Sequence, residues 1–290
     1  MIDAYFIHLL ILIGIYLILA ISLQLSLGYS GLLNLGHIAF FGIGAYVSAI
    51  LSSSGVPFLI SILVAGIISG FFGWLLSLPT SRLKGDYFAL TTLGFSFVVY
   101  AIFLNWIEIT KGPFGLPGIP RPNIFGIDFS SNTSFLILVI ILVLISYFFI
   151  HRICNSQFGK ALEATRDDEL AAKSLGKHTF KLKSISLAVS AFFAGIAGCL
   201  FASYITFIDP SSFTFINLIP ILLIVIIGGL ASLRGTILAT IIIVLLPEPL
   251  RFIGLPSSIL GPIRQIVFAL MLILIIYFKP RGFFGKVDLE

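Results

Sequence analysis

Ten of the 29 charged side chains in this 290-residue sequence fall within residues 159–183, GKALEATRDDELAAKSLGKHTFKLK. A catalytic or metal site would need such groups to combine with histidines or cysteines in a recognised spacing. The cysteines Cys154 and Cys199 have no metal-ligand spacing and stand in contexts that argue against a disulfide. The histidines are far apart, and none belongs to an H-E-x-x-H pattern: His8, His37, His151 and His178. We therefore expect neither an enzyme active site nor a metal centre.

The same segment contains Gly159-Lys160, which is one part of a phosphate-binding loop. The full G-x-x-x-x-G-K-[ST] pattern is absent, because the upstream glycine is missing and Ala161 follows the lysine. The chain is therefore not expected to bind or hydrolyse ATP, and no cofactor is predicted for it. The predicted spans also lack the central charged residues that an ion-coupled transporter uses. If the chain is a transporter, its energy must come from a partner.

The amino-acid composition predicts the kind of fold that positions these residues. Hydrophobic residues make up 59% of the chain and charged residues only 10%, against about 25% in typical soluble domains. A helix crosses a membrane with roughly 20 apolar residues, and runs of this kind recur along the whole sequence. We predict an all-α, polytopic transmembrane helical bundle of about 8–10 membrane segments, in a single transmembrane domain, 1–290. The expected segments are 4–27, 38–54, 57–79, 87–105, 135–150, 184–207, 214–231, 236–250 and 264–278.

Two of these runs, 38–54 and 236–250, are short enough to be partial or re-entrant helices. The first run lacks a basic leader and a small-residue cleavage site, so it is expected to be a spanning helix rather than a signal peptide. The outer loop 105–134 is rich in glycine and proline, which suit turns but not a regular helix. It is expected either to form a docking surface or to cap the bundle.

Lysines and arginines divide unequally between the two sets of loops that nine spans create. One set holds 13 of the 17, at 82–84, 152–183, 234 and 279–286, whereas the other holds Lys111, Arg121, Arg251 and Arg264. Basic loops are retained on the cytoplasmic side. We therefore predict that loop 151–183 and the C-terminus are cytoplasmic. The net charge of +5 follows from the same bias, and nothing in the sequence indicates nucleic-acid binding.

The charged segment has the signals of two short amphipathic helices. Asp167 or Asp168 is a suitable N-cap for a helix over Glu169–Leu175, and Gly176 is suited to end it in a left-handed conformation. Small and apolar residues form one stripe on that helix and another on the preceding one: Leu170, Ala171, Ser174 and Leu175, and Phe158, Ala161, Leu162 and Thr165. The segment is either a solvated connecting loop or a helix-in-groove contact with a soluble partner.

The sequence resembles the LivM-type permease subunit of branched-chain amino acid ABC transporters over nearly its whole length. Long strings in the family's order carry the resemblance: GYSGLLNLGHIAFFGIGAYVSAIL from Gly28, RLKGDYFALTTLGF from Arg82, GPFGLPGIPRP from Gly112, GKALEATRDDELAAKSLGKH from Gly159, SAFFAGIAGCLFASYITFIDPSSFTF from Ser190, GGLASLRGTILATIIIVLLPE from Gly228, and RQIVFALMLILIIYFKPRGFFG from Arg264.

The resemblance implies a multi-pass importer subunit of a prokaryotic inner membrane. It implies a second permease subunit of the LivH type, two ATP-binding subunits that bind the ATP, an external solute-binding protein and an amino-acid substrate. Permeases for urea or short amides are close in sequence, and a self-contained channel or facilitator is the competing class. The resemblance makes 159–176 the ATPase-coupling loop, with these candidate residues: Gly159, Leu162, Glu163, Ala164, Arg166, Asp167, Asp168, Leu170, Ala171, Leu175 and Gly176.

Candidate residues of the translocation path lie in two strings: Gly31, Asn34, Gly36, His37, Thr91 and Thr92. The alternatives are structural. Asn34 could cap a helix, His37 could bond to a main-chain carbonyl, and the two threonines could bond to their own helix. Family members often carry Gly-Glu where this chain has Ser96-Phe97, so the role of that carboxylate does not carry over.

Overall fold

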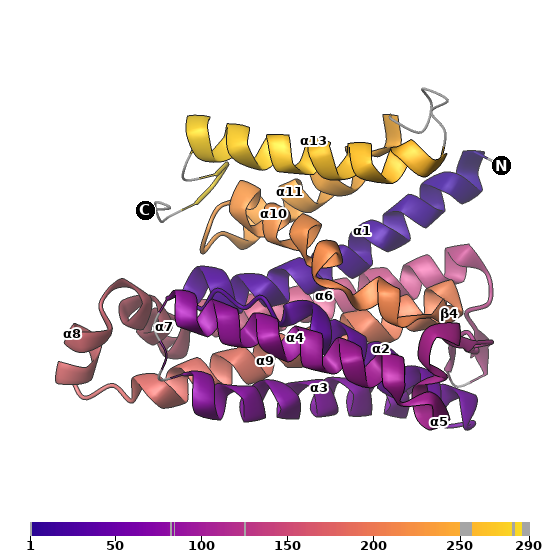
Figure 1. Ribbon diagram of the computed structural model, residues 1–290, viewed down its shortest axis with the longest axis horizontal. Coiled ribbons are helices and arrows are strands. Elements are labelled where there is room, and N and C mark those ends of the chain that lie inside the picture. Colours follow the sequence, from indigo (N-terminus) through magenta and orange to yellow (C-terminus); the bar gives the residue numbers. More distant parts are fainter. Residues whose placement is uncertain are drawn as a thin grey trace.

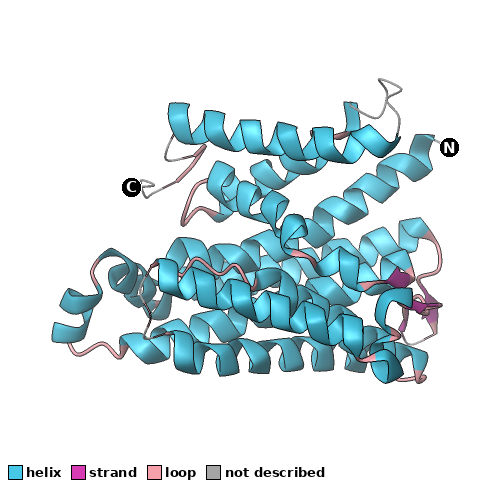
Figure 2. Ribbon diagram, in the orientation of Figure 1, coloured by secondary structure: helices cyan, strands magenta, loops and turns pink. Residues whose placement is uncertain are grey.

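The chain folds into a bundle of helices in the computed structural model, which describes residues 2–81, 83, 85–124, 126–249, 257–279 and 282–285. Regular structure is almost entirely helical (Figure 2). Five helices in the described part are long and apolar enough to cross a membrane. They are α1 (Ile2–Gln24) with its π-helical continuation η1 (Leu25–Tyr29), α3 (Phe58–Thr80), α4 (Asp86–Asn105), α6 (Asn132–Cys154) and α9 (Thr179–Ile205).

Four further apolar helices complete the described bundle: α2 (His37–Ser53), α10 (Ile219–Gly228), α11 (Leu233–Leu245) and α13 (Ser257–Phe278). Each of the nine predicted runs therefore contains a helix, which confirms the predicted helical membrane bundle. Several boundaries differ. α9 begins at Thr179, five residues before the predicted start, and α13 begins at Ser257, seven residues before it. Residues 250–256 lie outside the described residues.

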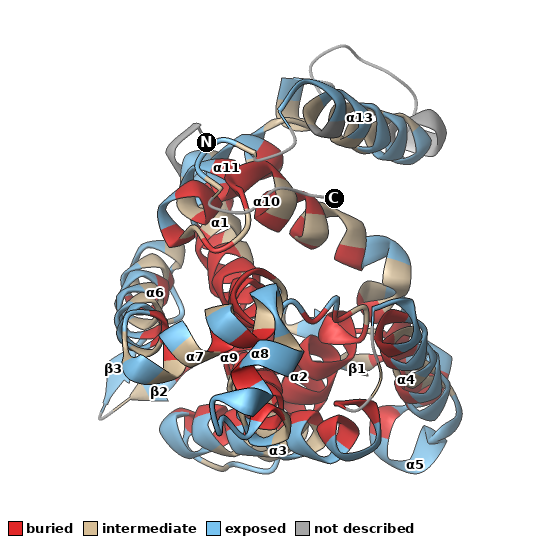
Figure 3. Cartoon of the chain, turned by 90° about the vertical axis from the view of Figure 1, so that its left-hand side faces the viewer, coloured by how far each residue is buried: buried red, intermediate tan, exposed pale blue. Residues whose placement is uncertain are grey.

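The core lies where α2, α3 and α9 pack against one another (Figure 3). α2 and α9 cross at glycines, since a Cβ added to Gly44 would lie 2.3 Å from the Cα of Gly195. Small residues at such crossings allow the backbones of membrane helices to approach closely. Large apolar side chains on the outer faces of α3, α4 and α6 remain exposed, as expected of surfaces that face lipid.

A seam of serine hydroxyls joins α1 and η1 to α9. Ser190 Oγ donates to the carbonyl of Ser22 at 2.6 Å, and the hydroxyls of Ser30 and Ser186 lie 2.6 Å apart. Ser26 lies between these positions and pairs with Ser190 at 3.2 Å. Serines spaced by four residues share one helix face, so the seam follows directly from sequence spacing. Its hydroxyls are satisfied without water.

The chain re-enters the bundle before α2 begins. After η1, residues 31–36 have no helical structure, and α2 then starts beside α1, where the Nε2 atom of His37 lies 3.1 Å from the carbonyl oxygen of Leu19. Leu19 is ten residues before Tyr29, roughly 15 Å along a helix. The prediction of a partial helix at 38–54 is therefore confirmed. Non-helical backbone at such depth is tolerated where protein or a cavity surrounds it, and Leu32, Asn34 and Gly36 of this segment are buried.

α10 and α11 form a hairpin, and both are shorter than a full span. They meet at Gly228 and Gly235, where no side chain would fit between the backbones. The prediction of a short helix in 236–250 is confirmed, but α11 covers this run only up to Leu245. α13 packs on α10, away from the α2–α3–α9 core (Figures 1 and 3).

The two ends of the bundle differ. One end carries the 105–134 segment, with a single turn α5 (Ile107–Thr110), the turn η2 (Gly112–Phe114) and the short strands β1 (Leu116–Pro117), β2 (Asn123–Ile124) and β3 (Ile127–Asp128). β1 pairs with β4 (Phe207–Ile208), which is followed by the 3-10 turns η3 (Pro210–Phe213) and η4 (Phe215–Leu218). The opposite end carries α7 (Gln157–Asp167) and α8 (Glu169–Ser174), at the left of Figure 1.

Among the described residues, lysines and arginines are concentrated at the end of the bundle that carries α7 and α8. α6 ends at Cys154 and α9 begins at Thr179, so the connection between them is 155–178, narrower than the predicted 151–183. Arg234 begins α11 and shares a cavity with His151 and Asn155 at the α7–α8 end. Several residues used in the orientation argument lie outside the described part: Arg82, Lys84, Arg251, Arg281, Lys286 and the C-terminal residues 286–290.

Candidate functional site

α7 begins with a tight turn after α6. The Ser156 hydroxyl caps its first turn by accepting a hydrogen bond from the Gly159 N–H. A Cβ at position 159 would lie 2.0 Å from the carbonyl oxygen of Cys154, so only glycine allows this approach. The predicted stripe faces the bundle, and its central residue Leu162 is fully buried. α7 is therefore held firmly against the membrane helices.

α8 has the predicted N-cap, and the predicted left-handed glycine follows it. The Asp168 carboxylate accepts hydrogen bonds from the N–H groups of Leu170 and Ala171, both at 2.9 Å, which makes Asp168 the N-cap rather than Asp167. Gly176 has φ of +76°, as predicted for a left-handed residue that follows the helix. The helix ends at Ser174, one residue earlier than expected. Two short helices over this segment are therefore confirmed.

Glu169 ties α8 to the start of α9, a role that the sequence analysis missed. Its carboxylate pairs with Lys183 at 2.6 Å and Lys173 at 2.9 Å, and it accepts a hydrogen bond from the Thr179 hydroxyl. The Lys183 side chain is only 8% exposed. Partial burial alone would raise the pKa of Glu169, but the hydrogen bonds from the two lysines and the charge of Lys183 outweigh it and lower this pKa to about 2.

Arg166 ties α7 to the end of the first membrane helix. Its Nη1 donates to the carbonyl of Gly28 at 2.7 Å, and its guanidinium also pairs with Asp167 at 2.8 Å. A Cβ at Gly31 would lie 2.7 Å from the Arg166 side chain. Two of the predicted coupling residues, Arg166 and Asp167, are thus paired with each other, and Arg166 also contacts the segment that leads into α2.

The outward face of α8 carries apolar residues. Leu170 is 70% exposed and Leu175 is 79% exposed, whereas Ala172 on the opposite face is buried. Ala171 and Ser174, which complete the predicted stripe, are exposed as well. Exposed leucines on a capped helix and directly after it are features of surfaces that contact other proteins, and a contact with a partner stays a prediction. Of the other predicted coupling residues, Glu163 is half-buried and Ala164 is exposed.

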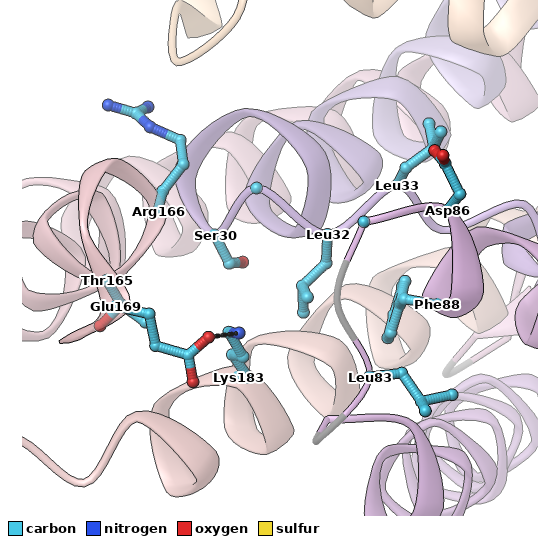
Figure 4. Close-up of a pocket in the computed structure, with 12 residues that line it drawn as sticks. Ser30, Leu32, Leu33, Leu83, Asp86, Phe88, Thr165, Arg166, Glu169 and Lys183 are labelled. Atoms are coloured by element: carbon cyan, nitrogen blue, oxygen red, sulfur yellow. Dashed lines mark hydrogen bonds and ion pairs between the residues drawn. The ribbon is translucent and has the colours of Figure 1, made fainter. Parts of the chain in front are cut away.

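A pocket of about 240 Å³ lies between α7–α8 and the re-entering segment (Figure 4). Its walls include Gly31, Arg166 and Glu169, together with Asp86 at the start of α4. The Lys183–Glu169 pair forms one side of it (Figure 4). The pocket brings the coupling segment next to one candidate path residue, Gly31.

The other candidate path residues divide into two groups. Asn34, Gly36, His37 and Thr92 are buried inside the chain, whereas Thr91 is exposed on α4. The Thr92 hydroxyl donates to the carbonyl of Ala89 and accepts from the N–H of Leu35, and the Thr91 hydroxyl donates to the carbonyl of Tyr87. Both threonine hydroxyls thus donate to carbonyls of their own helix, as expected if their role is structural rather than part of the path.

Asn34 and His37 also make structural contacts. The Asn34 carbonyl group accepts a hydrogen bond from the Gly36 N–H, and it does not cap α2, whose N-cap is Gly36. His37 lies within hydrogen-bond distance of a main-chain carbonyl and of the Ser22 hydroxyl. However, Nδ2 of Asn34 and Nδ1 of His37 are buried and find no hydrogen-bond partner among the described residues. Such orphaned polar atoms call for a functional or solvent explanation, and a path role for these residues stays a prediction.

Position 97, at which the resemblance to the permease family implied a glutamate, lies on the outer face of α4. Phe97 is 56% exposed, next to Val98 on the same surface. Ser96 is buried and donates its hydroxyl to the carbonyl of Leu93. A carboxylate at position 97 would thus point away from the core of this chain.

The chain is similar to permease components of transport systems. Residues 5–276 match the family described as branched-chain amino acid transport system, permease component. The LivM permease proteins of the high-affinity branched-chain amino acid transport systems of Salmonella typhimurium and Escherichia coli are each 37% identical to it, over 84% of this chain and 61% of theirs. The chain therefore spans about three fifths of the length of these relatives.

More distant relatives extend the comparison. A probable branched-chain amino acid transport permease protein LivM of Methanocaldococcus jannaschii is 27% identical, over 77% of this chain and 67% of that protein. LsrC, the permease protein of an autoinducer 2 import system in Yersinia pseudotuberculosis, is 25% identical over 67% of this chain and 54% of its own length. No solved structure matches the chain significantly.

Proposed function

The chain belongs to the permease-component family of branched-chain amino acid transport systems, and we propose that it is the membrane-spanning subunit of an ABC importer for such amino acids. In this proposal the chain forms part of the translocation path. ATP is bound and hydrolysed by two separate subunits, because this sequence has no phosphate-binding loop. A second permease subunit and an external solute-binding protein complete the transporter.

The observation that carries the proposal is the outward face of α8. Leu170 projects from a helix that is capped by Asp168 and anchored through Glu169, and Leu175 directly follows the last residue of this helix. An exposed apolar face on a fixed helix is the form of surface that fits a groove on another protein. Its anchors lead to the start of α9 and, through Arg166, to the end of η1. A force on α8 would therefore reach the membrane helices directly.

The proposed orientation places α7 and α8 in the cytoplasm of a prokaryotic cell, beneath its inner membrane. The support is the excess of lysine and arginine in the loops of that end. The end that carries β1 and β4 would then face outward and receive substrate from the solute-binding protein. The names of the most similar relatives support a branched-chain amino acid as substrate.

Copurification tests this proposal most directly. The chain would be expressed with the other transport genes of its source, extracted in a mild detergent and isolated through a tag on this chain alone. We expect two ATP-binding subunits and a second permease to accompany it. Leucine uptake by the reconstituted complex should depend on ATP inside the vesicle. Uptake by vesicles that hold this chain alone would instead identify a self-contained facilitator and refute the importer.

A further inference from the structure

A second cavity of about 270 Å³ lies far from α7 and α8, between α1, the α10–α11 hairpin and α13. It lies toward the end of the bundle that carries β1 and β4, because Leu9 and Leu12 belong to the first half of α1 and Glu248 follows the end of α11. Pockets for drug-sized ligands have about 300–1,000 Å³. This cavity suits a somewhat smaller molecule.

The wall of the cavity is apolar apart from a few polar groups. Leucine, isoleucine, valine and phenylalanine side chains make up half of its twelve lining residues: Leu9, Leu12, Ile224, Ile243, Val244 and Phe268. Two prolines add further apolar surface, and Tyr16 and Asn217 add polar groups. One acid, Glu248, and one base, Arg264, line the same cavity. An apolar wall with one group of each charge is typical of a site that fixes the orientation of a small ligand.

The placement of Arg264 corrects the sequence analysis. That analysis put Arg264 in an outer loop, but the residue lies within α13, about 10 Å from the start of the helix at Ser257. An ionisable residue at such a position is costly unless it has a partner or a function. The Nε atom of Arg264 is buried and has no hydrogen-bond partner. The guanidinium is therefore incompletely satisfied by the described part of the chain.

Glu248 does not supply the missing partner. Its carboxylate accepts a hydrogen bond from the Tyr5 hydroxyl, and no ion pair within 4.0 Å joins it to Arg264 in the described structure. An acid and a base that share a cavity without closing on each other leave room for a ligand that carries both opposite charges. An α-amino acid has an ammonium and a carboxylate on one carbon, together with a side chain for the apolar wall.

We propose that this cavity binds a zwitterionic α-amino acid with an aliphatic side chain. Arg264 receives its carboxylate, Glu248 its ammonium group, and the wall formed by α1, α10, α11 and Phe268 its side chain. The proposal rests on the proposed function, since it names a site at which the permease takes up its substrate from the outer side. A phosphatidylethanolamine headgroup carries the same pair of charges, so the test must separate the two sources.

The test measures leucine binding to the full chain in nanodiscs of phosphatidylglycerol, by saturation-transfer NMR. Leucine should bind, and leucinamide, which lacks the carboxylate, and 4-methylpentanoate, which lacks the ammonium group, should bind more weakly. Glu248→Gln and Arg264→Gln should each weaken leucine binding about tenfold or more, the effect of losing one charged hydrogen-bond partner. Arg264→Gln should also remove the preference for leucine over leucinamide, and Glu248→Gln the preference over 4-methylpentanoate.

Glu108→Gln and Lys111→Gln are matched controls, because they remove the same charges from exposed positions at the same end and should bind leucine normally. Equal binding by the two cavity variants and the controls would overturn the proposal. Loss of leucine binding when phosphatidylethanolamine is added to the nanodiscs would assign the cavity to lipid and also overturn it. If the intact transporter with Glu248→Gln takes up leucine normally, the site fails but the permease function stands. No amino-acid uptake with the unaltered chain would refute the proposed function instead.

Discussion

Replacing both exposed leucines of α8 with alanine should separate partner binding from folding. Leu170 and Leu175 are 70% and 79% exposed in the chain alone, so their loss removes little packing from the fold. In a complex, each substitution would withdraw three carbon atoms from the interface. At about 0.8 kcal/mol per buried carbon, the pair contributes roughly 5 kcal/mol if fully buried.

Interface leucines are seldom buried completely, so about half of that value, roughly 2.5 kcal/mol, is a fair expectation. This corresponds to a 50- to 100-fold weaker association with the ATP-binding subunits, since about 1.4 kcal/mol changes affinity tenfold. The double variant should therefore be made and inserted normally, but copurify with much less ATPase and take up little leucine.

Affinity should be measured by titrating the purified ATP-binding subunit against the labelled chain in nanodiscs, and stability by thermal unfolding of the same sample. Leu162→Ala on α7 is the matched control, because Leu162 is fully buried. That change should cost about 2–5 kcal/mol of folding stability. Unchanged ATPase affinity in the Leu170→Ala, Leu175→Ala variant would refute the docking surface and favour a solvated loop.

Three further expectations concern the same segment. Asp168→Ala should remove the α8 cap at a cost of about 0.5–2 kcal/mol, seen as faster hydrogen exchange over 169–175, whereas Asp167→Ala should not, because its carboxylate accepts no N–H of α8. The pKa of Glu169 is lowered from 4.5 to about 2, so its contribution to the stability of the folded chain is complete above about pH 4.5 and is lost as the pH falls toward 2. Hydrogen exchange in α8 should therefore rise over that pH interval, and Glu169→Gln should abolish this pH dependence. A cysteine at Lys173, with the native cysteines replaced, should resist an impermeant thiol reagent outside intact cells and react after permeabilisation; labelling of intact cells would reverse the proposed orientation.

Local signals predicted α8 well, because capping depends on residues that are close in sequence. Asp168 and Gly176 stand where the cap and the left-handed residue are needed, and tertiary contacts do not have to be known to recognise them. The Glu169–Lys173 pair was also accessible from its i, i+4 spacing. Lys183 was not, because its pairing depends on how the turn after Gly176 directs the chain into α9.

The start of α13 shows a different limit. The predicted segment began at Arg264, which was also counted among the basic residues of the outer loops, yet the helix begins at Ser257 and runs through Pro262. Membrane helices tolerate proline because neighbouring groups can satisfy the freed backbone atoms. The error moved Arg264 from a helix to a loop and so concealed its cavity. Charge and helix position were both needed to find this residue, and the sequence supplied only the charge.

The serine seam between α1 and α9 has a consequence for biosynthesis. Ser22 and Ser26 are hydrogen-bonded to Ser190, and Ser30 to Ser186. The Gln24 side chain donates to the carbonyl of Gly229. The ribosome makes these partners more than 150 residues after α1. Until then, the Gln24 amide lacks its partner at Gly229, whereas the three serine hydroxyls can donate to main-chain carbonyls of the preceding turn. α1 and η1 therefore acquire their final neighbours only after α9 and Gly229 have been made, and chains that stop before α9 should be substrates for membrane quality control.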